Sequence, residues 1–292
     1  MTDFDIKYGQ YQKIFEDYLA NFCKQLRCEP EILKESMLYS LNLGGKRIRP
    51  VLMLAFADLL GLDSPQVLNY ALALELIHTY SLIHDDLPEM DNDDFRRGKP
   101  SNHKVFGVGN AVLAGDGLLN TAFSILLDEC FKGRNNVSAA KYIADCAGIN
   151  GMIAGQSADL LHEHDSSIDE EILDFIHRNK TAKLIMAACL PPSILIGGKY
   201  YSEIKTFSCD LGLLFQLTDD ILDVEGSFES MGKSIGKDST EGKYTAVRLY
   251  GLSDSKLRAD LIFDRCIKML EGLDGDIEFL KNLVYFVRHR IH

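Results

Sequence analysis

Apolar residues recur about every 3.6 positions along nearly every long segment of this 292-residue chain. No segment shows the sustained alternation of apolar and polar residues that is typical of a half-buried strand. The period predicts amphipathic helices near residues 7–26 and 30–42, and further helices over 137–162 and 203–224. We therefore expect an all-α protein.

The stretch from His78 to Lys99 leads from an apolar helical segment into a crowded cluster of carboxylates. Six acidic residues lie between Asp85 and Asp94, and Pro88 is expected to end or kink the helix. Two carboxylates about 5 Å apart repel by roughly 3 kcal/mol at an effective dielectric of about 20. A cation is therefore expected among these side chains, although an acidic run of this kind is often only a solvated helix end.

The residue types of this cluster indicate which cation it would hold. No cysteine and no second close histidine accompany the acidic residues, which disfavours zinc. Oxygen ligands alone point to magnesium, manganese or calcium. A calcium-binding helical loop that starts at Asp91 fails, because Phe95 and Arg96 stand where an oxygen ligand and the glycine turn belong. Magnesium with a phosphate ligand fits better, since Arg96 and Arg97 follow at once.

A second acidic motif lies in GLLFQLTDDILDV, where Asp219 and Asp223 stand four apart with Gln216 one turn earlier. Like charges at that spacing destabilise a helix unless they are compensated, so a second cation site is expected. Two such motifs meet only if both face one cavity. We therefore predict that residues 1–292 form a single domain, a helical bundle around a central cavity, in which bridging magnesium ions clamp a diphosphate.

Basic residues follow a Gly-Gly pair in the segment LNLGGKRIRP. This segment is not a P-loop, because Arg47 stands where that motif needs Ser or Thr. Lys46 and Arg49 can instead hold a diphosphate as charge-assisted donors, or they form an exposed basic helix start.

Two later segments supply further positive charge. Lys180 lies in HRNKTAKLIMAACL, in a helix that Ser167 or Asp169 is expected to cap, and faces inward unless it snorkels to the surface. The loop EGSFESMGKSIGKDSTEGKY is longer than most connections and is predicted to be a lid. Its lysines would bring positive charge to an anion between the two metal sites; they are Lys233, Lys237 and Lys243.

The overall charge restricts the partners. With 31 basic and 43 acidic residues the net charge is -12, which argues against nucleic acid or an anionic membrane as a partner. The seven scattered cysteines lack metal-ligand spacing and are expected to be reduced. The N-terminal segment has no apolar core of a signal peptide, and we expect no run to approach membrane-spanning length. We expect a cytoplasmic protein.

Taken in chain order, five motifs make the chain resemble the short-chain trans-prenyl diphosphate synthases over nearly its whole length. They are GGKRIRP, DDLPEMD with RRGKP behind it, HRNKTA, FQLTDDILD and a downstream GK. Within that family the chain is most similar to the bacterial farnesyl diphosphate synthases. The resemblance implies the isoprenoid synthase fold, a homodimer, and three magnesium ions that bridge the allylic diphosphate. It implies a head-to-tail condensation of isopentenyl diphosphate with dimethylallyl or geranyl diphosphate to farnesyl diphosphate, by ionisation, condensation and elimination.

The resemblance also implies roles for individual residues. The main metal ligands would be Asp85, Asp91 and Asp219, with Asp86 and Asp223 as secondary or orienting carboxylates. The allylic diphosphate would contact Arg96, Lys180 and Lys233, and isopentenyl diphosphate would contact Lys46, Arg49, His78 and Arg97. Thr181 and Gln216 would lie beside the developing cation and, with Lys180, form the catalytic set.

Product length is encoded in part before the first acidic motif. Tyr80 and Ser81 precede Asp85 by five and four residues, so they project one turn deeper along the same helix. A bulky ring there would form a floor against which the growing chain stops. Together with the two extra residues in DDLPEMD relative to a DDxxD spacing, this resembles the farnesyl producers.

Three parts of the sequence depart from the family pattern. Ala182-Lys183 replaces the usual glycine and small residue after Lys-Thr, Ser234 stands where proline is common, and TAVRLYG replaces TYPSLLG. These changes bear on lid geometry and turnover, not on the metal motifs.

Three other functions are compatible with parts of the pattern. The same chemistry could stop at a geranylgeranyl product. A metal phosphohydrolase could use His84 and Asp85 as ligands, but it would need further inward-facing histidines. A non-enzymatic acidic helical protein could bind cations, and it would bind no diphosphate.

Overall fold

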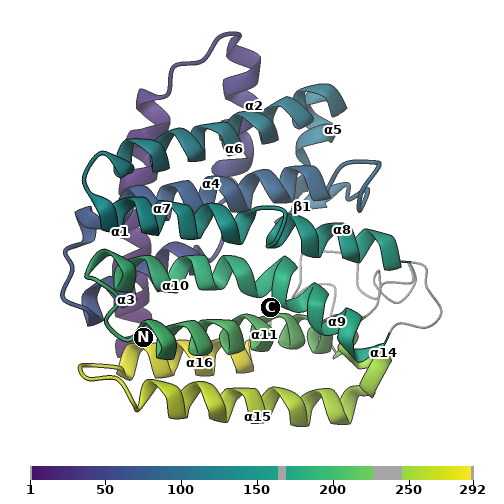
Figure 1. Cartoon of the computed structure of the whole chain (residues 1–292). Coiled ribbons are helices and arrows are strands. Elements are labelled where there is room, and N and C mark those ends of the chain that lie inside the picture. Colours follow the sequence, from purple (N-terminus) through teal and green to yellow (C-terminus); the bar gives the residue numbers. More distant parts are fainter. Residues whose placement is uncertain (1, 164–168, 226–244, 291–292) are drawn as a thin grey trace. The chain divides into compact units, whose positions relative to one another are not determined.

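The computed structural model describes residues 2–163, 169–225 and 245–290, and it is built almost entirely of helices (Figure 1). The all-α prediction is confirmed. The longer helices are α1 (Asp3–Gln25), α2 (Glu31–Leu41), α3 (Ile48–Leu59), α4 (Leu68–Asp85), α6 (Val108–Cys130), α7 (Arg134–Ala147), α8 (Met152–His162), α10 (Lys183–Leu195), α11 (Tyr201–Glu225), α15 (Leu252–Leu270) and α16 (Glu278–His289). The short elements are η1 (Ser64–Gln66), β1 (Phe95–Arg96), β2 (Lys99–Pro100), α5 (Asn102–Phe106), α9 (Glu170–Ile176), η2 (His177–Ala182) and α14 (Ala246–Tyr250).

The chain divides into two compact units, Met1–Ala140 and Lys141–His292. In the first unit α4 is the central helix and packs against α6, α3, α1 and α2. Its segment from Tyr70 to Ile77 is buried without interruption, including Glu75. A helix that is apolar on all sides must be surrounded by others, which is why α4 holds the first acidic motif at a fixed end.

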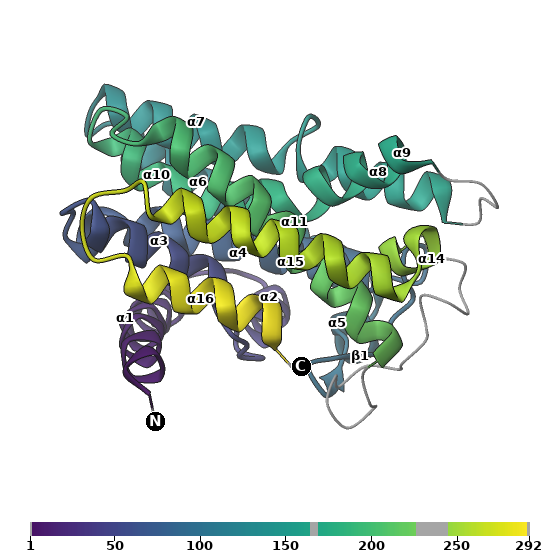
Figure 2. The ribbon, with the colours of Figure 1, turned by 90° about the horizontal axis from the view of Figure 1, so that it is seen from below.

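In the second unit α11 has the central place. It packs against α10, α15, α16, α14 and the η2 segment, and α8 packs on η2. The helices α15 and α16 lie side by side near the C-terminus (Figure 2). The predicted helix 203–224 is confirmed as α11, and Asp169 caps α9 by accepting a hydrogen bond from the Ile172 N–H at 2.9 Å. Ser167, the other predicted cap, lies outside the described residues.

Two local features differ from the sequence prediction. The single helix expected over 137–162 is wrong: the chain turns at 148–151, so that α7 and α8 are separate helices. The apolar period continues on both sides of the turn, which is why periodicity alone missed it. A two-residue antiparallel hairpin also pairs Phe95 with Pro100, a ladder too short to produce an alternating pattern.

The η2 segment is a π-helix, and it joins α9 to α10. Neighbouring helices approach it closely because they present glycine there. A Cβ on Gly155 of α8 would lie 2.1 Å from the Lys180 backbone nitrogen, and one on Gly212 of α11 would lie 2.4 Å from the Ala182 Cα. The alanine that departs from the family pattern is thus accommodated by the glycine opposite it.

Helix α6 is, among the described residues, the one helix long and apolar enough to cross a membrane by length and composition. The expectation that no run approaches that length is therefore wrong for this segment. One face of α6 is buried against α4, α2 and α5, as in a core helix of a folded unit. Its other face exposes apolar side chains, among them Leu113 and Leu127. All seven cysteines are unpaired, in agreement with the expected reduced state.

Candidate functional site

The first acidic motif is folded back on the end of α4. The helix ends at Asp85, before Pro88, as predicted. The Asp91 N–H then donates to the Asp85 carbonyl at 2.8 Å, and the Asn92 N–H donates to the Leu87 carbonyl at 3.0 Å. The loop therefore brings the first and last aspartates of DDLPEMD to the same end of the helix.

The middle aspartate of this motif is held by an arginine. Asp86 is buried, and Arg96 on the β1–β2 hairpin donates to both of its carboxylate oxygens, with Nε–Oδ distances of 3.0 and 3.3 Å. Arg96 also reaches Asp93 at 3.3 Å. Burial alone would lower the pKa of Arg96, but its hydrogen bonds and attraction to Asp86 outweigh burial and raise it. Asp86 therefore has the geometry of an orienting carboxylate, and Arg96 remains charged.

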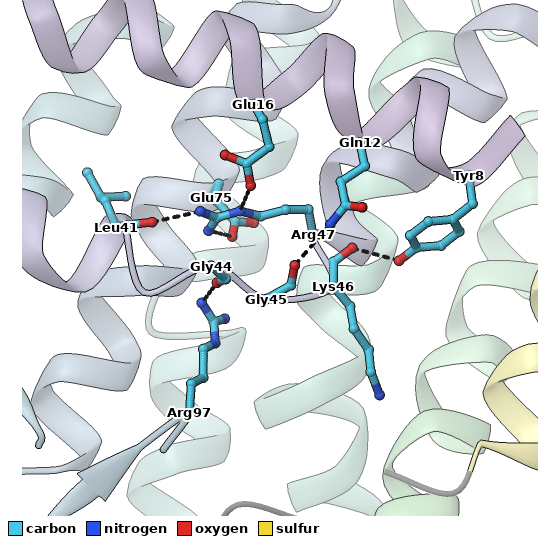
Figure 3. Close-up of polar contacts among 10 residues, drawn as sticks. All are labelled: Tyr8, Gln12, Glu16, Leu41, Gly44, Gly45, Lys46, Arg47, Glu75 and Arg97. Atoms are coloured by element: carbon cyan, nitrogen blue, oxygen red, sulfur yellow. Dashed lines mark hydrogen bonds and ion pairs between the residues drawn. The ribbon is translucent and has the colours of Figure 1, made fainter. Parts of the chain in front are cut away.

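The segment Gly44–Arg49 forms a basic turn before α3, which begins at Ile48. Its central residue, Arg47, adopts the left-handed conformation with φ 50° and is almost completely buried. Its guanidinium contacts Glu16, Glu75 and the Leu41 carbonyl at 2.7–2.8 Å (Figure 3). The predicted ligand contacts Lys46 and Arg49 thus flank a buried ion pair.

A second arginine docks on the same turn. Arg97 Nη1 donates to the Gly44 carbonyl (Figure 3). Gly45, with φ 123°, leaves the space that the guanidinium fills, since a Cβ there would lie 2.6 Å from Arg97 Cζ. The hairpin that carries Arg97 is therefore attached to the turn that carries Lys46 and Arg49.

His78 lies among these arginines, about two turns before Asp85 on α4. Burial lowers its pKa well below the usual value, and Arg49, Arg97, Arg96 and Arg47 lower it further. The imidazole is therefore neutral at neutral pH. Next to an anion, such a ring can donate one hydrogen bond without adding to the charge that the arginines already carry.

Tyr80 and Ser81 lie on α4 before the acidic end. Tyr80 is only 5% exposed, and burial together with the Asp85 charge raises its pKa to about 12. Its ring meets that of His84 edge-on, with centroids 5.7 Å apart. Ser81 donates its hydroxyl proton to the His78 carbonyl at 2.9 Å. The ring of Tyr80 is therefore neutral, and the hydroxyl of Ser81 bonds to its own helix.

His84 packs against α6. Its Nε2 lies 3.1 Å from the Val112 carbonyl, and its ring covers Gly115, where a Cβ would lie 2.1 Å from Nε2. Nε2 faces a carbonyl oxygen on α6 and is therefore a donor, so that only Nδ1 of His84 has a lone pair.

In the second unit the predicted catalytic residues form a connected chain of hydrogen bonds. Thr181 donates to Gln216 Oε1 at 2.7 Å, and Gln216 Nε2 donates to Asp220 at 2.9 Å. Lys180 contacts Asp159 of α8 at 2.5 Å. Thr181 and Gln216 are therefore neighbours, and Lys180 forms an ion pair.

Asp220 is a residue that the sequence analysis missed. It is buried, accepts a hydrogen bond from the Ala246 N–H at 2.7 Å, and lies 3.4 Å from His177 Nε2. Burial raises its pKa, while His177 and these hydrogen bonds oppose the shift. The signal was its position four residues after Gln216, on the side of α11 opposite to solvent. Asp220 orients the amide of Gln216 and joins it to the start of α14.

The second acidic motif also has an arginine partner that was not predicted. Arg290 Nη2 lies 2.7 Å from Asp219 Oδ1 and donates to the Phe215 carbonyl at 2.7 Å, while its guanidinium stacks 3.8 Å above the Phe215 ring. Asp223 lies one turn beyond Asp219 on α11. Lys233, Lys237, Lys243 and Ser234 lie outside the described residues.

The described residues contain no group of three or more His, Cys, Asp or Glu side chains arranged to hold a metal ion by themselves. The acidic motifs do offer the carboxylate oxygens that magnesium prefers. Magnesium keeps several ligands from water or from substrate phosphates, so an incomplete protein donor set of this type fits magnesium that is bound together with a phosphate ligand.

Comparisons with known proteins agree with these motifs. The polyprenyl synthetase family model matches residues 30–281. The chain is 42% identical to a farnesyl diphosphate synthase of Geobacillus stearothermophilus over 290 residues, 97% of each chain. It is 44% identical to a chloroplastic geranylgeranyl pyrophosphate synthase of Capsicum annuum over 85% of this chain and 68% of that protein. The crystal structure of a geranyltransferase from Legionella pneumophila matches with a TM-score of 0.88 at 32% identity, over 99% of both chains. A geranyltransferase from Helicobacter pylori, complexed with magnesium and isoprenyl diphosphate, matches with a TM-score of 0.84 at 31% identity, over 98% of this chain and 97% of that one.

The lowered pKa of His78 predicts how stability depends on pH. In the unfolded chain the imidazole binds a proton near its ordinary pKa of about 6.5, whereas in the folded protein it does not. The free energy of unfolding therefore falls as the pH drops below about 6.5, by at most about 1.4 kcal/mol per pH unit from this residue. We expect His78→Gln to lose less stability between about pH 7 and about pH 5 in urea unfolding. Identical pH slopes in the two proteins would contradict this.

Proposed function

This chain belongs to the polyprenyl synthetase family, and we propose how its residues perform the head-to-tail condensation of isopentenyl diphosphate with dimethylallyl and geranyl diphosphate to farnesyl diphosphate. It is a prenyltransferase of the all-α isoprenoid synthase fold. The observation that carries the farnesyl product is the identity of 41–42% to two bacterial farnesyl diphosphate synthases over nearly the whole chain.

The allylic diphosphate is the leaving group of the reaction. Asp85 and Asp91 on one motif, and Asp219 and Asp223 on the other, would hold magnesium, which supplies charge to the departing diphosphate when bound. Three ions are proposed from the family, and Asp86 acts by orienting Arg96, whose guanidinium it holds. Both motifs must reach one diphosphate, so a single domain around one cavity is part of this proposal. It is supported by solved relatives that match 98–99% of the chain.

The cations that contact the allylic diphosphate are already placed by carboxylates. Arg96 is held by Asp86, and Lys180 by Asp159 at 2.5 Å. These pairs fix the directions of both donors before substrate arrives. Lys233 completes the proposed set. After ionisation, Thr181 and Gln216 present oxygen dipoles to the carbocation, because Gln216 directs its amide nitrogen to Asp220.

Isopentenyl diphosphate would be held by the basic turn and its neighbours. Lys46, Arg49 and Arg97 provide fixed positive charge, and His78 provides a neutral donor. The double bond of isopentenyl diphosphate then attacks the allylic cation. The released diphosphate removes the proton that is lost in the elimination step, so no protein base is required.

The test of this function is product analysis with the purified chain. Incubation with dimethylallyl diphosphate, isopentenyl diphosphate and magnesium is expected to give a fifteen-carbon diphosphate, identified by chromatography after dephosphorylation. A twenty-carbon product would favour geranylgeranyl synthesis, which the identity to the Capsicum annuum protein makes the alternative. Absence of any condensation, with magnesium binding retained, would instead favour the non-enzymatic cation-binding protein.

Tyr80 is the residue proposed to limit product length. Its neutral, buried ring lies on α4 below the acidic end, and Tyr80→Ala would remove that floor. We expect the same assay to show products longer than fifteen carbons for Tyr80→Ala. The control is Ser81→Ala, which deletes only a hydroxyl that is bonded to the His78 carbonyl and should extend the product far less. An unchanged product in Tyr80→Ala would overturn the floor.

We also propose a cytoplasmic homodimer that does not bind membranes or nucleic acid. The support is the exposed apolar side of the first unit, where Leu113 is 55%, Leu127 63% and Phe131 91% exposed. A net charge of -12 disfavours contact with anionic lipid or nucleic acid. Sedimentation of wild-type protein is expected to give a dimer and that of Leu127→Asp a monomer. A wild-type monomer would refute the dimer.

A further inference from the structure

We propose that Arg47, held by Glu16 of α1 and Glu75 of α4, is a positioning residue that presents Lys46 and Arg49 to isopentenyl diphosphate. Helix α1 would then be part of the substrate site, although it precedes the matched family region, residues 30–281. The inference rests on the proposed function and assigns a role to residues that contact no substrate.

The Arg47 guanidinium is enclosed by the protein and is not available to a ligand. Its side chain is 1% exposed, and each part of the guanidinium has its own acceptor. The Nε–Glu16, Nη1–Glu75 and Nη2–Leu41 carbonyl distances are 2.7, 2.8 and 2.7 Å (Figure 3). A residue in the basic turn that cannot reach substrate must act through its neighbours.

The backbone of the turn is held from the same side. The Tyr8 hydroxyl donates to the Lys46 carbonyl at 2.6 Å, and Gln12 Nε2 donates to the Gly45 carbonyl at 3.1 Å. Both donors come from α1, where Tyr8 lies about two turns and Gln12 about one turn before Glu16. In Figure 3 the Lys46 side chain points away from these contacts. One face of the turn is therefore attached to α1, which leaves Lys46 directed to the other.

The two glutamates also decide the charge of the turn. Burial alone would lower the pKa of Arg47, but Glu75 and Glu16 outweigh burial and raise it, so Arg47 stays charged and paired. Without these carboxylates, a buried positive charge would stand beside Lys46 and Arg49 and push them apart. Their pairing lets Arg47 fix the left-handed turn while the ligand meets only its neighbours.

Glu16 is the better probe, since its side chain is 41% exposed whereas that of Glu75 is 2% exposed. Loss of Glu75 would leave a buried arginine without its main partner and would endanger folding. Glu16→Ala removes one contact at the edge of the network. Asp17→Ala, at the next residue of α1, is the matched control. The Asp17 side chain is exposed, and its ion pair with Lys13 of the same helix is long, at 3.9 Å.

The experiment measures steady-state kinetics of the full chain with geranyl and isopentenyl diphosphate. We expect Glu16→Ala to raise the KM for isopentenyl diphosphate about fivefold, with kcat and the KM for geranyl diphosphate within about twofold of wild type. Glu16→Gln keeps an oxygen that can accept from Arg47 Nε and should recover most of the loss. Tyr8→Phe, which removes the contact to the Lys46 carbonyl, should change the same KM in the same direction.

Calorimetric titration with isopentenyl diphosphate gives a second measurement that does not depend on turnover. An active Glu16→Ala with wild-type affinity would overturn the inference and leave the proposed function intact. A parallel change in kcat and in both KM values would also overturn the inference, because that pattern indicates general loss of structure.

Should Glu16→Ala not fold, an unchanged KM for isopentenyl diphosphate in Tyr8→Phe would overturn the inference. Wild-type protein that neither condenses nor binds isopentenyl diphosphate would overturn the proposed function itself.

Discussion

Repulsion between like charges, and its compensation by arginine and lysine, is the constraint on which the functional parts of this chain depend. In the first unit Asp86 is matched by Arg96 and Glu75 by Arg47. In the second unit Asp219 is matched by Arg290. In each pair, the arginine and the carboxylate come from different parts of the chain. Removing either partner would leave a charge with no equal replacement, most costly where the pair is buried, as it is for Glu75.

These pairs also set what the site can do when an anion arrives. A guanidinium that is already oriented by a carboxylate loses little freedom on binding phosphate, so its full charge is available in a fixed direction. The Arg96 guanidinium is oriented in this way by Asp86, and the Lys180 ammonium is oriented by Asp159. Arg290 is different, because it occupies an oxygen of Asp219 that the proposed mechanism gives to magnesium. Asp219 can ligate the ion only as that contact loosens or shares the carboxylate.

The helices were predictable because burial imposes a period on the sequence. Residues 203–224 emerged as α11 with its ends shifted by one or two positions. The failure over 137–162 has a physical cause, since a turn that keeps the apolar face aligned on both sides leaves no trace in the period. The π-helix over His177–Ala182 is likewise absent from the pattern, because it depends on the close approach of Gly155 and Gly212.

The acidic motifs were predictable for a different reason. Two carboxylates four residues apart on an apolar helix repel each other, so the pattern predicts a cation beside them. Their arginine partners were not, because a pair such as Asp219 and Arg290 is distant in sequence and leaves no local pattern. Glu75 did leave a signal, as a single charge in the apolar run LNYALALELIH. A lone buried carboxylate predicts a buried cation somewhere else in the chain, although it does not say which one.

The incomplete donor set follows from the same constraint. If either acidic motif gathered enough carboxylates to hold magnesium alone, the helix end would carry their repulsion whenever the ion was absent. The structure instead assigns Asp86 to Arg96 and leaves, among the described residues, no cluster able to bind a metal by itself. In the proposed function, magnesium would therefore bind tightly only together with the diphosphate whose oxygens complete its coordination shell. Magnesium affinity and substrate affinity would then be coupled, and the positive charge needed for ionisation would be complete only when the allylic substrate is bound.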